Sequence, residues 1–240
     1  MPAAAPLLLG HRGARHYAPE NTIAAFELAL EHGCDGFEFD VRLTLDDCAV
    51  LCHDPLYFGR AVREATYEQL TAGEGDDLAN ALLSRRGVLP ALEPLPRLET
   101  VLETFASRAW LDIELKVRGL EQMVIDLLRQ WPPVHGVLVS SFLPEVIAAC
   151  AELDTRLPLG LICDRRAQLA LWETLPVSFV LPHRKLLDRE LLEEMRVAGK
   201  RVMVWTVNDE RDMVRFAEWG VDGLISDDTA LLGRVFRRAV

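Results

Sequence analysis

Short apolar runs alternate with amphipathic stretches of helical period along the sequence. Glycines such as Gly33, Gly136 and Gly199 stand before several of the apolar runs, where a preceding helix is expected to end. Strands that alternate with helices are typical of a parallel sheet, because each helix carries the chain back to the edge from which the strand started. The predicted strands cover residues 7–10, 36–43, 110–117, 136–141, 157–163, 178–181, 201–207 and 222–226, and the predicted helices cover residues 21–32, 119–131, 144–153, 165–175, 188–198 and 209–218.

Eight strands in 240 residues predict a single (β/α)8 TIM barrel over residues 1–240. Half of the residues are hydrophobic, which is enough to fill the large core of such a barrel. A doubly wound open sheet is the alternative, but the sequence has no glycine-rich dinucleotide or phosphate-loop motif in favour of it. We therefore expect the functional groups at the carboxyl ends of the strands.

One further apolar run, residues 49–53, follows residues 36–44 after a link of only four residues, 45–48. So short a link cannot hold a parallel crossover, so the pair is predicted to be an antiparallel hairpin. A turn centred between Asp46 and Asp47 would place His53 directly opposite Asp40, and a bulge would shift this pairing by one residue.

Residues 55–98 interrupt the barrel rhythm with glycines and prolines among polar residues. We interpret this stretch as an insertion within the barrel domain that covers one end of it. Such an insertion can shape the access of a substrate, or it can be inert decoration.

Charge and cysteine content exclude several classes of protein. The net charge of −11 argues against a nucleic-acid partner but not against a small anionic substrate, which needs only a local positive pocket. Five scattered cysteines without a CxxC pair indicate neither a zinc site nor a disulfide framework. No apolar run approaches the roughly 20 residues of a membrane span, so we expect no stable membrane insertion and a cytoplasmic location. The oligomeric state is left open.

Two histidines are candidates for acid–base chemistry. His11 and Arg12 follow the first predicted strand, on the face where barrel enzymes carry their active sites. A histidine exchanges protons near neutral pH, and the planar fork of an arginine matches phosphate oxygens. His53 ends the hairpin strand, and general acid–base work suits it better than metal ligation does.

Carboxylates recur at every second position of two predicted strands, as Glu38 and Asp40 in one and Asp112 and Glu114 in the other. Residues i and i+2 of a strand point to the same face, so each pair projects together. Such charges on a buried strand are costly unless they are paired or bind a metal, and a structural salt bridge is the alternative interpretation. Their oxygen ligands suit Mg²⁺ or Ca²⁺. Lys116 would face the phosphate, while Asp112 lies deeper and is interpreted as structural.

Other residues near these strand ends carry weaker indications. The ring of Trp205 either flanks the organic part of a substrate or belongs to the core. Arg15 and Arg42 are positive groups near the site, for which we expect surface roles. His183 is a peripheral candidate. Ser140 lacks the surroundings of a nucleophile elbow.

Taken together and in order, these motifs resemble those of the glycerophosphodiester phosphodiesterases. The resemblance runs from residue 7 to about residue 228, and the insertion also matches in position. Two departures are Ser226-Asp227-Asp228, where members commonly read Thr-Asp-x-Pro, and Asp46-Asp47 in place of an Asp-Gly turn. The matching motifs are His11-Arg12-Gly13, Pro19-Glu20-Asn21-Thr22, Glu38-x-Asp40-Val41, Thr44-x-Asp46, His53-Asp54, Glu114-x-Lys116 and Trp205-Thr206-Val207-Asn208.

The resemblance implies a metal-dependent hydrolase that converts small glycerophosphodiesters to sn-glycerol 3-phosphate and an alcohol. It implies that His11 and His53 form the catalytic acid–base pair and that Arg12 binds phosphate. It further implies one divalent cation, Mg²⁺ or Ca²⁺, held by Glu38, Asp40 and Glu114. In the same resemblance Lys116 supports the phosphate and Trp205 lines the pocket.

Three alternatives on the same barrel remain open at this stage. A cyclising phospholipase or lyase would use a similar histidine pair and release a stable cyclic phosphate. A lysophospholipase D-type activity would need access for a long acyl chain. A catalytically inactive binding module would lack a histidine or a metal ligand, and neither is missing from the sequence. The nucleophile is either a neighbouring hydroxyl of the substrate or a water molecule.

Overall fold

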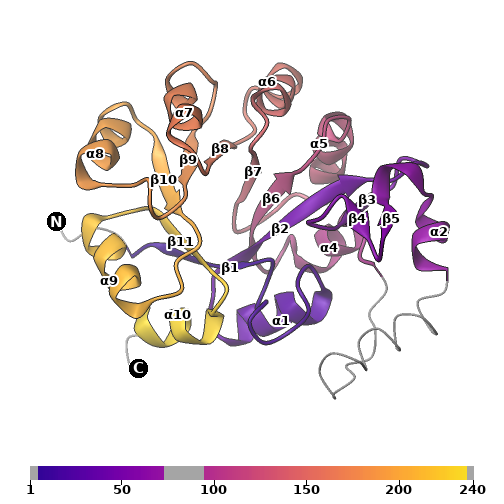
Figure 1. The fold of residues 1–240 in the computed structure, drawn as a ribbon, viewed down its shortest axis with the longest axis horizontal. Coiled ribbons are helices and arrows are strands. Elements are labelled where there is room, and N and C mark those ends of the chain that lie inside the picture. The colour runs from indigo at the N-terminus through magenta and orange to yellow at the C-terminus, as the bar shows by residue number, and fades with distance from the viewer. Residues whose placement is uncertain (1–4, 73–94, 237–240) are drawn as a thin grey trace.

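The computed structural model describes residues 5–72 and 95–236, and these contain a closed barrel of eight parallel strands (Figure 1). Around the barrel the order is β1-β11-β10-β9-β8-β7-β6-β2, and the pairing of β1 with β2 closes the ring. The TIM-barrel prediction is therefore confirmed. The strands are β1 (Leu7–His11), β2 (Gly36–Leu43), β6 (Trp110–Leu115), β7 (Val137–Ser141), β8 (Leu159–Cys163), β9 (Phe179–Pro182), β10 (Arg201–Val204) and β11 (Gly223–Ser226).

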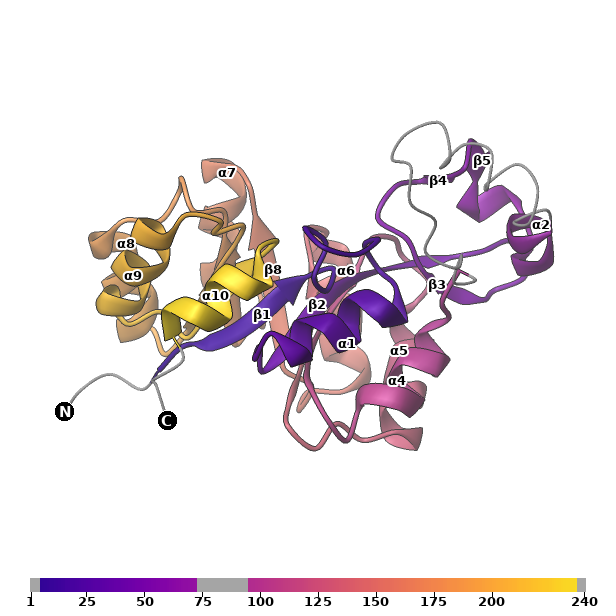
Figure 2. The same ribbon diagram turned by 90° about the horizontal axis from the view of Figure 1, so that it is seen from below.

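Helices surround the strands on the outside of the barrel (Figures 1 and 2). Five of the six predicted helices agree with the structure to within two residues at each end. The sixth, 165–175, is instead a four-residue α-helix followed by a 3₁₀ turn, and α4 and α10 were not among the predicted helices. In the described part of the chain no helix is long and apolar enough to cross a membrane. The helices are α1 (Ile23–Glu31), α4 (Leu98–Phe105), α5 (Glu121–Gln130), α6 (Pro144–Leu153), α7 (Arg166–Leu169) with the 3₁₀ turn η2 (Ala170–Glu173), α8 (Arg189–Val197), α9 (Glu210–Trp219) and α10 (Thr229–Phe236).

Polar side chains determine where several helices begin. Thr22, Asp188 and Asp209 precede α1, α8 and α9, and each side chain accepts a hydrogen bond from a backbone N–H of the first turn. These N–H groups have no partner inside the helix, so the cap stabilises the start of each helix by about 1 kcal/mol. For α1 this cap limits the loop after β1 to residues 12–22, which carry part of the site.

The alternation of side chains along the strands divides the core into two layers. Outside the barrel, Phe37 of β2 stacks on Phe26 of α1 with 4.1 Å between the ring centroids. Inside it, an apolar layer fills the amino-terminal half, made by Leu9, Trp110, Leu138, Ile162, Phe179, Leu181, Met203 and Ile225. Beyond this layer, the inward positions of β2 and β6 carry carboxylates. The interior is therefore apolar at one end and charged at the other.

The hairpin after β2 has a different register from the predicted one. Strand β3 (Ala49–Leu51) runs antiparallel to β2 with Leu51 opposite Val41, and the backbone N–H of Cys52 donates to the carbonyl of Asp40. The prediction that His53 lies directly opposite Asp40 is therefore wrong by one residue. The loop contains three residues instead of two, and its last residue, Asp47, takes the left-handed conformation with φ 54° that such loops require.

Part of the predicted insertion 55–98 is described, and its residues 73–94 lie outside the described residues. It begins with a two-strand hairpin, β4 (Leu56–Tyr57) and β5 (Arg60–Ala61), followed by the 3₁₀ turn η1 (Val62–Glu64) and α2 (Tyr67–Thr71). A small apolar cluster packs these elements against β3 through Val50, Val62 and Leu70. Figure 2 shows that β2 reaches beyond the other strands toward this subregion.

Gly36 at the start of β2 gives a test of the barrel packing. A Cβ atom there would overlap the backbone carbonyl of Trp110 on β6. Because the backbone cannot yield without breaking the β2–β6 pairing, Gly36→Ala should lower the free energy of unfolding by about 3 kcal/mol. At Gly223 an added Cβ meets mainly the flexible side chain of Met203, so Gly223→Ala is the matched control, with a loss of about 1 kcal/mol. Urea denaturation measures both, and equal losses would contradict this account.

Candidate active site

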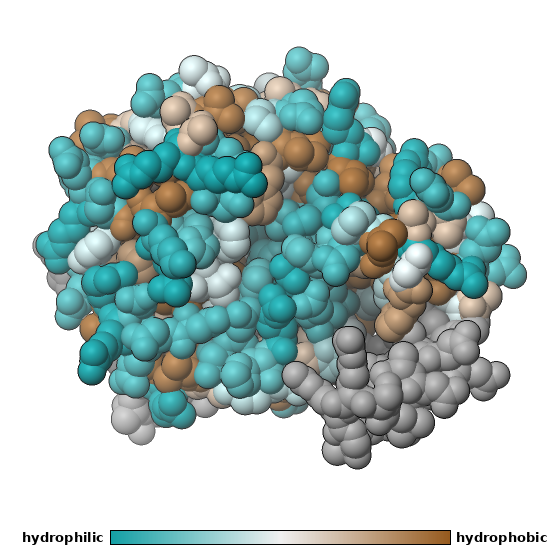
Figure 3. Space-filling model, in the orientation of Figure 1, coloured by the Kyte–Doolittle hydropathy of each residue, from teal (hydrophilic) through white to brown (hydrophobic). Residues whose placement is uncertain are grey.

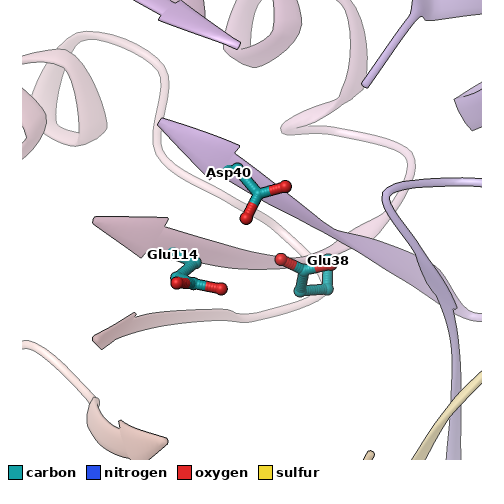
Figure 4. A group of neighbouring side chains, drawn as sticks. All are labelled: Glu38, Asp40 and Glu114. Carbon is teal, nitrogen blue, oxygen red and sulfur yellow. The ribbon is translucent and has the colours of Figure 1, made fainter. Parts of the chain in front are cut away.

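Three buried carboxylates converge inside the charged end of the barrel. Glu38 and Asp40 project from β2 and Glu114 projects from the adjacent β6, toward one another (Figure 4). Asp40 and Glu114 are partners in the β2–β6 register, and Glu38 lies one pleat earlier on the same face. One oxygen from each of the three lies within 4.8 Å of the others. The predicted metal ligands therefore form one cluster.

Two cationic side chains balance part of this charge. Arg12 Nε lies 3.0 Å from Asp40 Oδ2, while Lys116 Nζ lies 3.2 Å from Asp40 Oδ1 and 2.6 Å from Glu114 Oε1. The amide of Asn21 also donates to Asp40 Oδ2 at 2.9 Å. Three carboxylates thus face two cations.

The protonation of the cluster follows from this imbalance. Burial and the charges of Asp40 and Glu114 raise the pKa of Glu38 well above its usual value. Burial, together with the charge of Asp40, raises the pKa of Glu114 to about 7. Burial also opposes ionisation of Asp40, but the charges of Lys116 and Arg12 outweigh it and lower the pKa of Asp40. The cluster therefore favours additional positive charge.

The carboxylate oxygens fit a divalent cation. Glu38 Oε1 is buried and accepts no hydrogen bond from the described residues, while Asp40 Oδ1 and Glu114 Oε1 are contacted by Lys116. Carboxylate oxygens are the ligands that Mg²⁺ and Ca²⁺ prefer. The residues present therefore agree with the hard-cation site that the sequence predicts.

His11 is held between the carboxylate cluster and the last strand. Its Nδ1 lies 2.6 Å from Asp227 Oδ1, and its Nε2 lies 3.9 Å from Glu38 Oε2. Asp227 is fixed in turn by the amide of Asn208, which donates to Oδ2 at 2.7 Å and accepts from the Asp227 backbone N–H. Because a carboxylate accepts the Nδ1 proton, Nε2 of the neutral ring is free to accept another. Burial lowers the pKa of His11, and the hydrogen bond to Asp227 opposes that effect.

His53 lies in more open surroundings just beyond β3. Its side chain is 34% exposed, and its Nδ1 lies 2.8 Å from Asp54 Oδ1. Burial opposes the lowering of the Asp40 pKa, and among the groups that lower it His53 comes after Lys116, Arg12 and Asn21. The two histidines therefore belong to the same end of the barrel but differ in how firmly they are held.

Three aromatic side chains, those of Trp205, Phe142 and His183, pack together near Lys116. Trp205, just after β10, donates from Nε1 to the carbonyl of Leu181 at 2.8 Å. Its ring meets Phe142 and His183 edge-on, with centroid distances of 5.6 and 5.3 Å. Lys116 Nζ lies 5.6 Å from the centroid of Phe142.

Hydrophilic residues predominate on the face shown in Figure 3 and surround the hollow near its centre.

The contact between His11 and Asp227 was not predicted from the sequence. The sequence marks Asp227 only as part of a departure from the family pattern. The predicted barrel could have indicated the contact, because closure of a barrel makes the first and last strands neighbours. In the structure Gly10 pairs with Ser226. The residues that follow these two partners, His11 and Asp227, therefore lie side by side.

Sequence comparisons place the chain among known enzymes. The model of the glycerophosphoryl diester phosphodiesterase family matches residues 11–231. A glycerophosphodiester phosphodiesterase of Caldanaerobacter subterraneus subsp. tengcongensis is 30% identical to this chain, over 97% of this chain and 98% of its own length. One from Bacillus altitudinis is also 30% identical, over 92% of this chain and 94% of its own length.

Solved structures agree with the barrel architecture. A phosphodiesterase of Oleispira antarctica, in complex with the product sn-glycerol-3-phosphate, superposes with a TM-score of 0.80 over 96% of both chains at 24% identity. A glycerophosphodiester phosphodiesterase of Parabacteroides distasonis gives a TM-score of 0.81 over 97% of both chains at 23% identity. The family match over nearly the whole barrel and the relatives at 30% identity agree with one another. The chain therefore belongs to the glycerophosphoryl diester phosphodiesterase family of hydrolases.

Proposed function

We propose that this enzyme hydrolyses small glycerophosphodiesters to sn-glycerol 3-phosphate and an alcohol, by acid–base catalysis at a bound divalent cation. The observation that carries the proposal is His11 between Asp227 and a buried cluster of three carboxylates. The product bound to the Oleispira relative supports the same substrate class. The segment 55–98 is proposed to shape access to the site within a single barrel domain.

The cation belongs at Glu38, Asp40 and Glu114, as either Mg²⁺ or Ca²⁺. When bound there, it supplies Lewis-acid chemistry that offsets the charge of the phosphate during attack. Lys116 and Arg12 are the protein's own positive groups next to this position, and each is largely buried, with side chains 12% and 11% exposed. Fixed positive charge in a buried site stabilises the negative charge that develops on the phosphate oxygens.

The histidines divide the proton transfers between them. His11 Nδ1–H donates to Asp227, so His11 Nε2 removes the proton from the nucleophile, either a neighbouring substrate hydroxyl or water. His53 stands near the carboxylates and gives a proton to the leaving alkoxide. Each transfer of this kind contributes roughly 10²–10⁴-fold to the rate. Trp205, with Phe142 beside it, contacts the organic part of the substrate.

Release of glycerol 3-phosphate from glycerophosphocholine tests the reaction. The wild-type enzyme with Mg²⁺ or Ca²⁺ should release it, and a chelator should abolish release because the three carboxylates then lack their cation. His11→Ala should lower kcat by about 10²–10⁴-fold because the general base is lost. Coupled enzymatic detection of glycerol 3-phosphate measures both effects. Accumulation of a stable cyclic phosphate instead would favour the cyclising lyase.

Asp227→Asn tests the orientation of His11. An asparagine cannot hold the Nδ1 proton as a carboxylate does, so kcat should fall by about 10²-fold or more while KM stays nearly constant. The neighbouring Asp228→Asn is the matched control, because Asp228 accepts from the Tyr17 hydroxyl and does not contact His11 in the described contacts. Initial-rate kinetics measure both variants. A similar loss in the two would contradict an orienting role for Asp227.

Thermal unfolding tests the cation site without turnover. At about 100-fold excess over its dissociation constant, Mg²⁺ or Ca²⁺ should stabilise the fold by about 2.7 kcal/mol, a rise in Tm of roughly 5–10 °C. Glu38→Gln removes one of the crowded negative charges, so the metal-free variant should be at least as stable as wild type. Its response to the cation should nevertheless be much smaller. A full response in Glu38→Gln would exclude Glu38 as a ligand.

A further inference from the structure

Arg42 holds the main chain of His53. Its Nε and Nη2 both donate to the carbonyl oxygen of His53, at 3.0 and 2.7 Å. Arg42 lies on β2, two residues after Asp40, and is half-buried. The sequence had indicated only a surface role for this residue. The structure instead shows both of these N–H groups turned toward one backbone oxygen.

The position of this contact matters because the β2–β3 ladder ends there. The strand β3 stops at Leu51, and the backbone N–H of Cys52 still donates to Asp40 at 3.1 Å. The ring of His53 bonds to Asp54, whose side chain is 74% exposed. A hydrogen bond to an exposed sequence neighbour moves with the loop and constrains the ring little. The fork from Arg42 ties His53 to the rigid barrel strand that carries Asp40.

We propose that Arg42 is a positioning residue, which places the His53 imidazole for proton transfer by clamping the His53 carbonyl. The inference rests on the acid–base role proposed for His53. Arg42 does not touch the substrate in this account, and its contribution passes through His53 alone. A displacement of about 1 Å in a catalytic group costs up to about 10²-fold in rate.

A rival explanation is that Arg42 acts by its charge on the nearby carboxylates or on the phosphate. Lysine keeps the charge but cannot reproduce the planar two-donor fork. If the clamp operates, Arg42→Lys should lower kcat about tenfold and Arg42→Met about 10²-fold, with KM within about threefold of wild type. If the charge alone matters, Arg42→Lys should match wild type.

A double-mutant cycle separates action through His53 from a general structural effect. We would measure kcat for glycerophosphocholine in wild type, Arg42→Met, His53→Ala and the double variant, at enzyme concentrations that quantify residual turnover. Residues that act as one unit are strongly non-additive, so adding Arg42→Met to His53→Ala should change kcat by less than about twofold. Losses that multiply would overturn the inference. Wild-type turnover in His53→Ala would instead show that the proposed role of His53 is itself wrong.

Controls guard against a folding defect. Arg63 of the 3₁₀ turn η1 also donates to a backbone carbonyl, that of Thr44 just after β2, so Arg63→Met should keep kcat within about twofold of wild type. If Arg42→Met does not fold, as judged by Tm, the cycle is run with Arg42→Lys. NMR of the histidine side chains supplies a second measurement. Arg42→Lys should shift the His53 ring signals and leave those of His11 in place, and unshifted His53 signals would overturn the clamp.

Discussion

Three buried carboxylates, one oxygen of each within 4.8 Å of the others, impose a cost that Arg12 and Lys116 offset in part among the described residues, and the rest of the site is arranged to limit it. Isolated buried charges are expensive, so Asp40 takes contacts from Arg12, Lys116 and Asn21. Burial, together with the charge of Asp40, raises the pKa of Glu114 to about 7 despite the contact with Lys116. An apolar layer fills the barrel beneath the cluster.

Closure of the barrel places His11 and Asp227 beside this cluster. Strand β1 lies between β2 and β11, so His11 meets Glu38 on one side and Asp227 on the other. The two contacts come from residues 27 and 216 positions away along the chain, which explains why the local sequence gives no indication of them. His53 is held differently, by a main-chain contact from Arg42 on β2. The two histidines thus depend on different elements, and their variants test different parts of the fold.

Each place where prediction from sequence failed has its own physical cause. The hairpin register was wrong by one because the choice between a two- and a three-residue loop depends on a left-handed Asp47, which the pattern of apolar residues does not reveal. The helix α4 was not predicted, because the helical spacing of apolar residues in 98–105 follows directly on the glycine- and proline-rich insertion. The expected helix 165–175 shortened into a 3₁₀ turn, a change that packing rather than helical period decides.

The sequence by itself determined the barrel class, the eight strands and the shared face of the carboxylates on each strand, Glu38 with Asp40 and Asp112 with Glu114. It could do so because hydrophobic alternation and the two-residue period of a strand are local properties. The motif order also sufficed to indicate the family. Only the tertiary structure decided that Asp227 orients His11 and that Arg42 holds His53, since both contacts depend on strand neighbours and loop register. Local periodicity carries no information about which side chains meet across neighbouring strands or which carbonyl an arginine will reach.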